Sequence, residues 1–526
     1  MVSIQENGGF MRYCWPENTE FEKIVLLPEF RECPICGKNL HICSHRNRKL
    51  FTLQGPKHIF CHLTHCVNSD CSGKSITYSP PSEQALAMPY WLIGWDVFAY
   101  IGHRRFSRHW SVSQICTELR ETYQIIISHD IVENHIRYYQ TIVSARQSDF
   151  QILSKEYCNT SDVILSIDGL QPEKGHETLY VVREVRQKRV LFAEPLLSST
   201  YGEVERLLIR AKECVAQMNL PVRLWISDKQ DAFVKGIASV FPGVPHRYCD
   251  NHFLRDLAKI VLETDSAAKV EMRKRIRGLR EVEKEMMESI NAKEAQFPAG
   301  TELREHSVLD YCSALRGILT DDQGGPLQPP GLKMATGVKE VRESLDECLQ
   351  MKKGGEAENG IEKLIAIIDK GLEAVKEKQE IIRSQVADIR AVSECLDPKN
   401  GSQKERSIIF EALNERLQGS EDKTRLYMAG VMKRFAPGLF VGGDDPDLPR
   451  DNQELERFFK SPKGHERRIH GHRHAGIRIV TDGATLLPTL DAHIHHPATF
   501  NVFELLPYVS AEIPKAQQDS KARKKK

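Results

Sequence analysis

The stretch VILSIDGLQPEKGHETLYVVREVRQKRVLFAEPL, residues 163–196, decides the fold of the centre of the chain. It contains three short runs of β-branched and other apolar residues, each of which predicts a mostly buried strand. An amphipathic helix, a fourth strand and a second helix follow, so this region is typical of an α/β unit with a mixed sheet. The predicted ranges are 163–168, 178–185, 189–196 and 222–228 for the strands, and 202–218 and 230–241 for the helices.

Aspartates stand at the ends of two of these strands. Asp168 ends the first strand, directly before Gly169, and Asp228 ends the fourth. Ligands of open α/β sheets gather at such strand ends. Two carboxylates there suit Mg²⁺ or Mn²⁺, which takes oxygen ligands and keeps positions for water and phosphate. Either aspartate alone is equally compatible with a simple turn former.

The composition is that of an ordinary globular protein. The chain has 526 residues, enough for about three or four domains, and 40% of them are apolar. Its 73 basic and 72 acidic residues leave a net charge of +1, so a charged partner has to meet a local patch. Because no apolar run is long enough for a membrane span and the N-terminus does not resemble a signal peptide, we expect a soluble, cytoplasmic protein.

Residues 256–430 differ in composition from both flanks. They are rich in Glu, Lys, Arg and Leu, and a heptad-like series of apolar residues runs from Ile361 to Leu396, with Asn359 as a candidate helix cap. This pattern predicts an all-α insertion. A coiled-coil scaffold is the alternative class of protein, but the series covers too little of the chain to explain its strands, cysteines and acids.

Cysteines cluster near the N-terminus, where seven of the 14 precede residue 72. Cys33 and Cys36 form one closely spaced pair and Cys66 and Cys71 another, and four thiolates are enough to close a tetrahedral structural zinc site. Buried cysteines without metal are the alternative. Rival ligand sets stay open through Cys43, His45, His58, Cys61, His62 and His65.

Residues 111–140 have the spacing of a helix-turn-helix. Apolar residues recur at helical intervals, and Ser128 is a candidate cap of the second helix. In such motifs the N-terminal part of the second helix enters the major groove of DNA, so His129, Asn134 and Arg137 are candidate DNA contacts. A plain helical hairpin gives the same spacing.

Three blocks of sequence, taken in order, resemble the DDE transposases of prokaryotic insertion sequences, in particular the group with an N-terminal zinc finger and helix-turn-helix. The resemblance implies a ribonuclease-H-like catalytic domain with a helical insertion before its last acid. It also implies a structural zinc ion held by Cys33, Cys36, Cys66 and Cys71. The blocks are SIDGLQPEKGHETLYVVREV (166–185), WISDKQDAFVKGIASVFPGVPHRYCDNH (225–252) and FAPGLFVGGDDPDLPRDNQELERFFKSPKGHERRIHGH (435–472).

Residue by residue, the resemblance assigns the catalytic, metal-binding triad to Asp168, Asp228 and Glu456. The last block of the family reads T-N-N-x-L-E, and this chain departs from it with Asp451 at the Thr position, where Asp can still cap a helix, and with Gln453 at the second Asn position. Glu454 is a rival for the third role. Residues two apart on a helix point about 200° apart, so only one of the two glutamates can face the aspartates.

Two further features accompany the triad. Cys249 and His252 match a C-x-x-H pair of several transposase families. A role in packing, or in supporting a metal ligand through a hydrogen bond, fits this pair as well as a catalytic role does. A basic run follows Glu456, and its position favours phosphate contacts by Lys463, Arg467 and Arg468 over a merely solvated face. The run also includes Lys460, His465, His470, His472 and Arg473.

The resemblance implies both a chemistry and a set of partners. Two Mg²⁺ or Mn²⁺ ions activate a water and neutralise the leaving 3′ oxygen, and the freed 3′-OH is then joined to target DNA. We therefore expect a nucleoid-associated DDE transposase, a homo-oligomer that binds the terminal inverted repeats of a mobile element and cuts and joins double-stranded DNA. The alternatives are a catalytically inactive, transposase-derived DNA-binding protein and a related ribonuclease-H-like nuclease.

The predicted fold class is a multidomain α+β chain. In this scheme the ribonuclease-H-like domain is interrupted by the helical insertion. The expected parts are a zinc-binding domain (1–85), a helix-turn-helix domain (86–150), the first catalytic part (160–255), the insertion (256–430), the last catalytic part (431–510) and a basic disordered tail (511–526).

Overall fold

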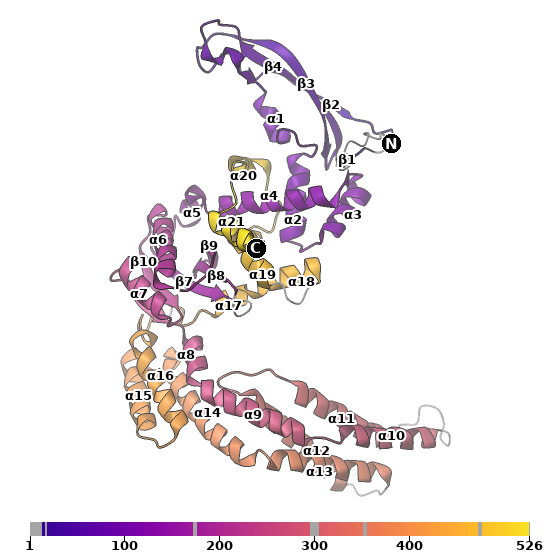
Figure 1. Ribbon diagram of the computed structural model, residues 1–526, viewed down its shortest axis with the longest axis vertical. Coiled ribbons are helices and arrows are strands. Elements are labelled where there is room, and N and C mark those ends of the chain that lie inside the picture. The colour runs from indigo at the N-terminus through magenta and orange to yellow at the C-terminus, as the bar shows by residue number, and fades with distance from the viewer. Residues whose placement is uncertain are drawn as a thin grey trace. The chain divides into compact units, whose positions relative to one another are not determined.

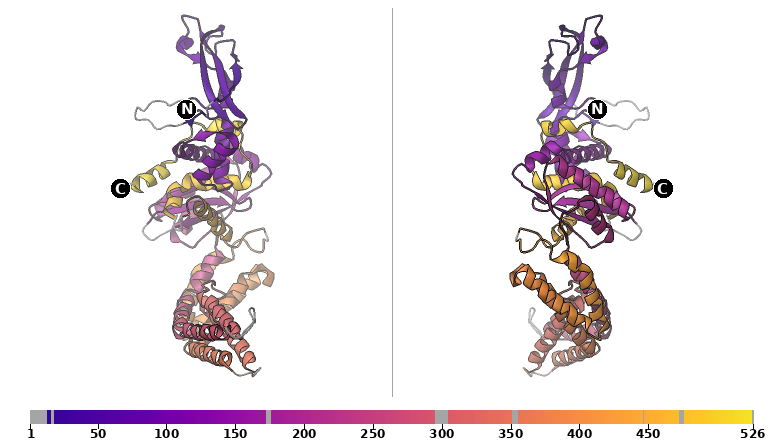
Figure 2. Two further views of the ribbon diagram at one scale, coloured as in Figure 1. Left: turned by 90° about the vertical axis from the view of Figure 1, so that its right-hand side faces the viewer. Right: turned by 90° about the vertical axis from the view of Figure 1, so that its left-hand side faces the viewer.

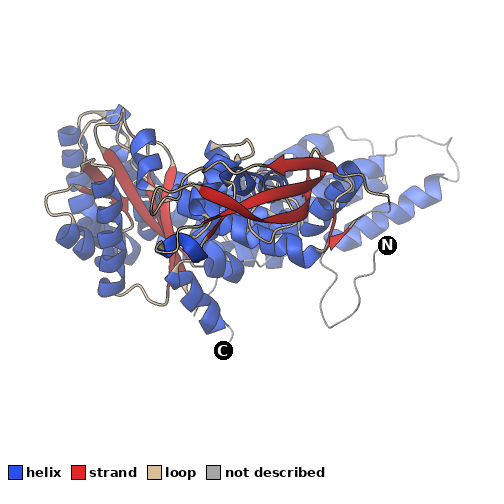
Figure 3. Ribbon diagram, turned by 90° about the horizontal axis from the view of Figure 1, so that it is seen from above, coloured by secondary structure: helices blue, strands red, loops and turns tan. Residues whose placement is uncertain are grey.

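The computed structural model describes residues 13–15, 18–171, 176–294, 304–350, 355–445, 447–471 and 476–524. The chain forms two compact units: the first is Met1–Val244 together with Asn452–Lys526, and the second is Pro245–Asp451. Helices predominate over strands, as Figure 3 shows. The expectation of an α+β chain is therefore confirmed, and the predicted insertion at 256–430 falls inside the second unit.

The first unit begins with a small β module. Strands β3 and β4 are antiparallel from Leu40 opposite Cys66 to Thr52 opposite Gly55, so two residues link them, and β2 runs parallel to β4. Figure 2 shows this hairpin as a long, narrow ribbon. From Ile59 to Leu63, every second residue of β4 is buried on the side of α1, which leaves the residues between them on the other face. The bounds are β2 (Glu22–Leu26), β3 (Leu40–Thr52), β4 (Gly55–Cys66), β5 (Thr77–Tyr78) and α1 (Pro81–Leu86).

Four helices follow the β module. Helix α3 begins at a capping box of Ser111 and Gln114 and ends at Gln124, whose φ of 56° is left-handed. Ser128 lies at the N-cap of α4, as predicted, although its side chain makes no capping hydrogen bond. Between α3 and α4, the short strand β6 pairs with β1. The bounds are α2 (Trp95–Phe106), α3 (Val112–Tyr123), α4 (His129–Gln147), α5 (Phe150–Glu156), β1 (Tyr13–Cys14) and β6 (Ile126–Ile127).

A mixed sheet forms the centre of the first unit, with its strands in the order β10-β7-β8-β9; β11 belongs to the second unit by its place in the chain. β8 is antiparallel to both β7 and β9, whereas β10 is parallel to β7. Both faces are buried: Leu165 and Ile167 face a core with α6 and α7, and Leu179 and Val181 face one with α19. The bounds are β7 (Val163–Leu170), β8 (Thr178–Glu184), β9 (Arg189–Leu196), α6 (Tyr201–Gln217), β10 (Val222–Ser227), α7 (Asp231–Val240) and β11 (His246–Tyr248).

The C-terminal segment returns to this sheet. Helix α19 is buried between β9 and α4 (Figure 1). The tail expected to be disordered instead forms helix α21 over Lys515–Lys524. It is ordered because α19 offers partners: Gln517 accepts a hydrogen bond from the Thr485 backbone N–H at 3.0 Å. The other bounds are α17 (Gln453–Phe458), α18 (Lys460–His470), α19 (Gly476–His495), α20 (Val502–Leu505) and a 3₁₀ turn at Leu506–Tyr508.

From α8 to α16 the second unit is helical (Figure 1). The apolar series expected to form one helix is broken at Ala374 and Val375 into α13 and α14, which lets both helices pack on α9. Asn359 is not the cap, because α13 starts earlier, with Gly355 at its N-cap. The bounds are α8 (Asp250–Leu257), α9 (Lys259–Arg275), α10 (Leu279–Glu294), α11 (Arg304–Thr320), α12 (Pro330–Gln350), α13 (Glu356–Glu373), α14 (Lys376–Leu396), α15 (Gln403–Gln418) and α16 (Lys423–Leu439).

No helix in the described ranges is both long enough and apolar enough to cross a membrane.

Candidate metal centres and nucleic-acid surfaces

Asp168 and Asp228 lie side by side near the carboxyl ends of two parallel strands: Asp168 is inside β7, two residues before its end, and Asp228 directly follows β10. Ile226 of β10 is opposite Ser166 of β7, so the two aspartates, each two residues further on, come level with one another on the same face. One carboxylate oxygen of each lies within 4.8 Å of the other. Two carboxylates at this separation can share a divalent cation.

The surroundings of the two aspartates are polar and tightly packed. The backbone N–H of Gly169 donates to Asp168 Oδ1 at 2.7 Å. Burial raises the pKa of the nearby Tyr180 hydroxyl, and the negative charges of Asp168 and Asp228 raise it further. Gly169 itself lies opposite Tyr180, and a Cβ there would come within 3.0 Å of the Tyr180 ring. The Asp-Gly pair therefore fits a position where strand β7 passes close to an aromatic ring.

Helix α17 starts directly beside Asp168. The side-chain amide of Asn452, which lies at the N-cap of α17, donates to the Ile167 carbonyl at 3.3 Å. Asp451, the expected cap, is one residue too early. Glu456 is one helical turn beyond Asn452, and its backbone N–H donates to the Asn452 carbonyl at 3.0 Å. Residues four apart share a helix face, so Glu456 lies on the face of α17 that meets β7.

Glu454 points to a different part of the sheet. Its carboxylate forms ion pairs with Lys188 at 3.0 Å and Arg457 at 2.9 Å, and the hydrogen bond from Lys188 is the main cause of its lowered pKa. Its backbone carbonyl accepts from Arg183 at 3.1 Å. These contacts favour Glu456 over Glu454 for the third position.

The structure brings two of the three predicted acids together. Within the described part of the chain, Glu456 does not join Asp168 and Asp228 in a group whose ligand atoms all lie within 4.8 Å of one another. Carboxylates repel one another unless a cation lies between them. The assignment of Glu456 as the third ligand of the divalent cations therefore stays a prediction.

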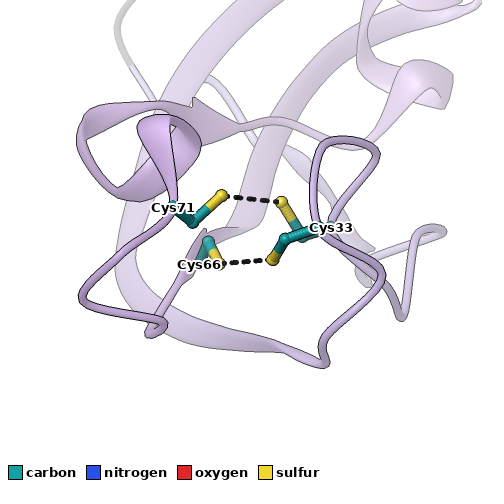
Figure 4. Close-up of side chains that lie close together, drawn as sticks. Cys33, Cys66 and Cys71 are labelled. Atoms are coloured by element: carbon teal, nitrogen blue, oxygen red, sulfur yellow. Dashed lines mark hydrogen bonds between the residues drawn. The ribbon is translucent and has the colours of Figure 1, made fainter.

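Cys33, Cys36, Cys66 and Cys71 converge as the sequence predicts. Their four sulfur atoms lie within 4.8 Å of one another, at 3.8 Å for Cys33–Cys71 and 3.5 Å for Cys36–Cys66. Figure 4 shows Cys33, Cys66 and Cys71 pointing toward one centre. Zinc bonds of about 2.3 Å place tetrahedral thiolates about 3.8 Å apart, so this set fits a structural zinc ion.

Backbone N–H groups support this cluster. Hydrogen bonding from the Ile35 backbone lowers the pKa of the Cys33 thiol to about 6, whereas the pKa of Cys71 is raised to about 12 despite a backbone hydrogen bond from Gly73. Such a split is typical of thiols that share one site, because the first to lose its proton hinders the others. A bound dication removes this competition. None of the rival residues, Cys43 and Cys61 among them, belongs to this group of four.

The second helix of the predicted helix-turn-helix is α4. His129, Asn134 and Arg137 are all exposed on it. Arg137 pairs with Glu133 at 2.9 Å and donates to Asn134 Oδ1 at 3.4 Å. The three predicted side chains are thus accessible to a partner.

Helix α18 divides the predicted basic run into two faces. Lys463, Arg467 and Arg468 are exposed, in line with a phosphate-contacting surface. His465 is buried and stacked on Phe106, and burial together with the charge of Arg105 lowers its pKa to about 2. His465 is therefore a neutral packing residue and not part of the basic surface. His472 and Arg473 lie outside the described residues.

Sequence reasoning missed the residues that orient α17. Arg183 and Lys188 hold Glu454, and Asn452 holds the start of the helix. The signal for Asn452 was its spacing of four from Glu456, which places both on one helix face. Cys249 and His252 lie at the N-cap and in the first turn of α8, where Cys249 is buried.

Comparison with known proteins gives no match: no described protein family fits this chain, and no curated protein is similar enough to count as a relative. The function proposed below therefore rests on the residues of this chain alone.

Proposed function

We propose that this protein is a DDE transposase that binds the terminal inverted repeats of an insertion sequence and cuts and joins DNA. The observation that carries the proposal is the meeting of Asp168 and Asp228 near the carboxyl ends of two neighbouring parallel strands. Ligands of open α/β sheets bind at such strand ends, and paired carboxylates are typical ligands of Mg²⁺ in phosphoryl-transfer sites.

In this proposal Asp168, Asp228 and Glu456 hold the divalent cations in a ribonuclease-H-like domain. When bound, two such ions lower the pKa of an attacking water and neutralise the leaving 3′ oxygen. Asn452 fixes the start of α17 against β7, so that Glu456 faces the strand that carries Asp168. Gly169 has no Cβ, which leaves room for the Tyr180 ring beside strand β7.

The remaining parts of the first unit supply DNA binding. Helix α4 presents His129, Asn134 and Arg137 to the major groove, and α18 presents Lys463, Arg467 and Arg468 to phosphates. The four-cysteine cluster holds a structural zinc ion that fixes the β module. Because two transposon ends have to be held at once, the active form is a homo-oligomer.

The test is incubation of the full chain with DNA that carries the element's own ends, in Mg²⁺, with each cut mapped to the nucleotide. We expect cuts at the element boundary that leave 3′-OH ends, followed by joining to target DNA. Asp168→Asn and Asp228→Asn should abolish both steps and keep end binding. Asp162→Asn is the matched control, because Asp162 lies about 20 Å away, beyond the other end of β7, and pairs with Arg186.

Each outcome separates one class of protein from another. Cutting without joining favours a related nuclease. End binding by the wild-type chain with no cutting favours a transposase-derived DNA-binding protein. Cutting that persists in Asp168→Asn contradicts the assignment of the site.

A further inference from the structure

Within the described residues, the sheet of the β module is covered on one face and open on the other. Ile59, Cys61 and Leu63 of β4 point inward, toward α1. The residues between them, Phe60 and His62, point outward and are only partly buried. On the neighbouring strands the same outer face carries Lys23, His45 and Lys49, each exposed and opposite an outward residue of β4.

The charged side chains of this sheet are mostly basic. Strands β3 and β4 contain no Asp or Glu, but they contain two lysines, two arginines and five histidines. The one acidic residue of β2, Glu22, forms an ion pair with Lys57 at 2.9 Å. On the inner side, Arg46 and Arg48 pair with the buried Glu83. Among the described residues, no acidic side chain forms an ion pair with Lys23 or Lys49, so both charges face an anionic partner of the outer face.

Aromatic rings alternate with these cations. The Lys23 ammonium lies 4.8 Å from the Phe60 ring centroid, and the Lys49 ammonium lies 4.3 Å from that of Phe21. The His58 ring lies 4.1 Å from Phe60. Flat rings interleaved with lysines on an open sheet can stack unpaired bases and contact the phosphates between them.

We propose that this outer face, formed by Lys23, His45, Lys49, His58, Phe60 and His62, binds single-stranded DNA. Charge complementarity selects an anionic partner, and the partly exposed rings favour one whose own flat faces are exposed. The bases of duplex DNA are stacked inside the helix, so a flat sheet cannot reach their faces. This activity is separate from duplex recognition by α4 and needs no catalytic metal, so it stands or fails independently of the proposed cleavage.

The test uses the full, zinc-loaded chain without Mg²⁺ and measures fluorescence anisotropy of a labelled oligothymidylate. We expect Phe60→Ala to weaken binding roughly tenfold or more. Lys23→Gln and Lys49→Gln should each reduce the slope of log affinity against log salt by about 0.7. Lys74→Gln, an exposed cation in the same module but outside this face, should bind like the wild type.

Zinc content and circular dichroism show whether each variant is folded, and the two lysine variants keep the test valid if Phe60→Ala is not. The proposal is overturned if the wild-type chain does not bind the oligothymidylate. It is also overturned if the lysine variants bind with the wild-type affinity and salt slope, or if these variants weaken binding of a duplex of equal length as much as binding of the single strand.

Discussion

Asn452 donates a hydrogen bond from its side-chain amide to the backbone carbonyl of Ile167, at 3.3 Å. This bond joins the start of α17 to the strand that carries Asp168. Two segments almost 300 residues apart in sequence are thereby held next to each other, with Glu456 one turn along the helix. The contact explains why the two neighbouring glutamates of α17 are not equivalent.

Replacing the two glutamates should therefore affect cleavage to different extents. We expect Glu456→Gln to reduce Mg²⁺-dependent cleavage by more than the roughly 10- to 100-fold that loss of an outer-shell partner costs. Glu454→Gln removes partly exposed ion pairs with Lys188 and Arg457, which costs about 1 kcal/mol of stability at most, and should keep activity. Equal losses in single-turnover cleavage would show that α17 does not orient the site in this way.

Zinc should follow the four converging cysteines. We expect the purified chain to carry about one zinc ion, measured by mass spectrometry of the metal, and Cys33→Ser or Cys36→Ser to lose it. Cys43→Ser is the control, because Cys43 is exposed and stands outside the group. Acid should also release the metal, since protons compete for the thiolates. A folded, metal-free wild-type chain would refute the site.

Gly169→Ala should destabilise the first unit. The added Cβ would lie 2.7 Å from Thr178 Cγ2 and 3.0 Å from Tyr180 Cε1, so strand β8 has to shift. Overpacking of this kind costs about 1–3 kcal/mol, which denaturant unfolding can measure. Gly202→Ala in α6 is the matched control, since its Cβ meets nothing within 4 Å. Similar losses in both variants would argue against close packing at Gly169.

Removing an exposed cation of α18 should change the salt dependence of DNA binding. Arg467→Ala removes an exposed cation, so the slope of log affinity for end DNA against log salt should decrease by about 0.9. Arg186→Ala, at the far end of β7, should leave the slope unchanged. An unchanged slope in Arg467→Ala would show that Arg467 contacts no DNA phosphate and is only solvated.

His465 should make the first unit sensitive to acid. Its pKa is about 2 in the folded chain against 6.5 for an ordinary histidine, so below about pH 6.5 the unfolded chain takes up a proton that the folded chain does not. The free energy of unfolding should therefore fall as the pH falls. His465→Phe should reduce this dependence by up to about 1.4 kcal/mol per pH unit between about pH 2 and 6.5.

Local patterns in the sequence were sufficient for the central strands. The apolar runs that predicted strands at 163–168, 178–185, 189–196 and 222–228 correspond to β7, β8, β9 and β10. These strands are largely buried on both faces, so their sequences are mostly apolar. The spacing of the cysteines was equally informative, because a metal-binding set leaves a local signature.

Features that depend on distant partners could not be predicted. The basic run at 460–473 does not reveal that His465 packs on Phe106, more than 350 residues away in sequence. The orientation of Glu454 depends on Lys188, in the turn after β8. The break between α13 and α14 allows both helices to pack on α9, and no proline marks it in the sequence.

The most direct test of the central claim is binding of Mn²⁺ to the zinc-loaded chain, measured by electron paramagnetic resonance. The account predicts that the wild type and Asp162→Asn bind Mn²⁺, and that Asp168→Asn and Asp228→Asn both lose it, with all four chains equally folded. Equal binding of Mn²⁺ by all four, or no binding by the wild type, would contradict the claim that these two aspartates form a metal site.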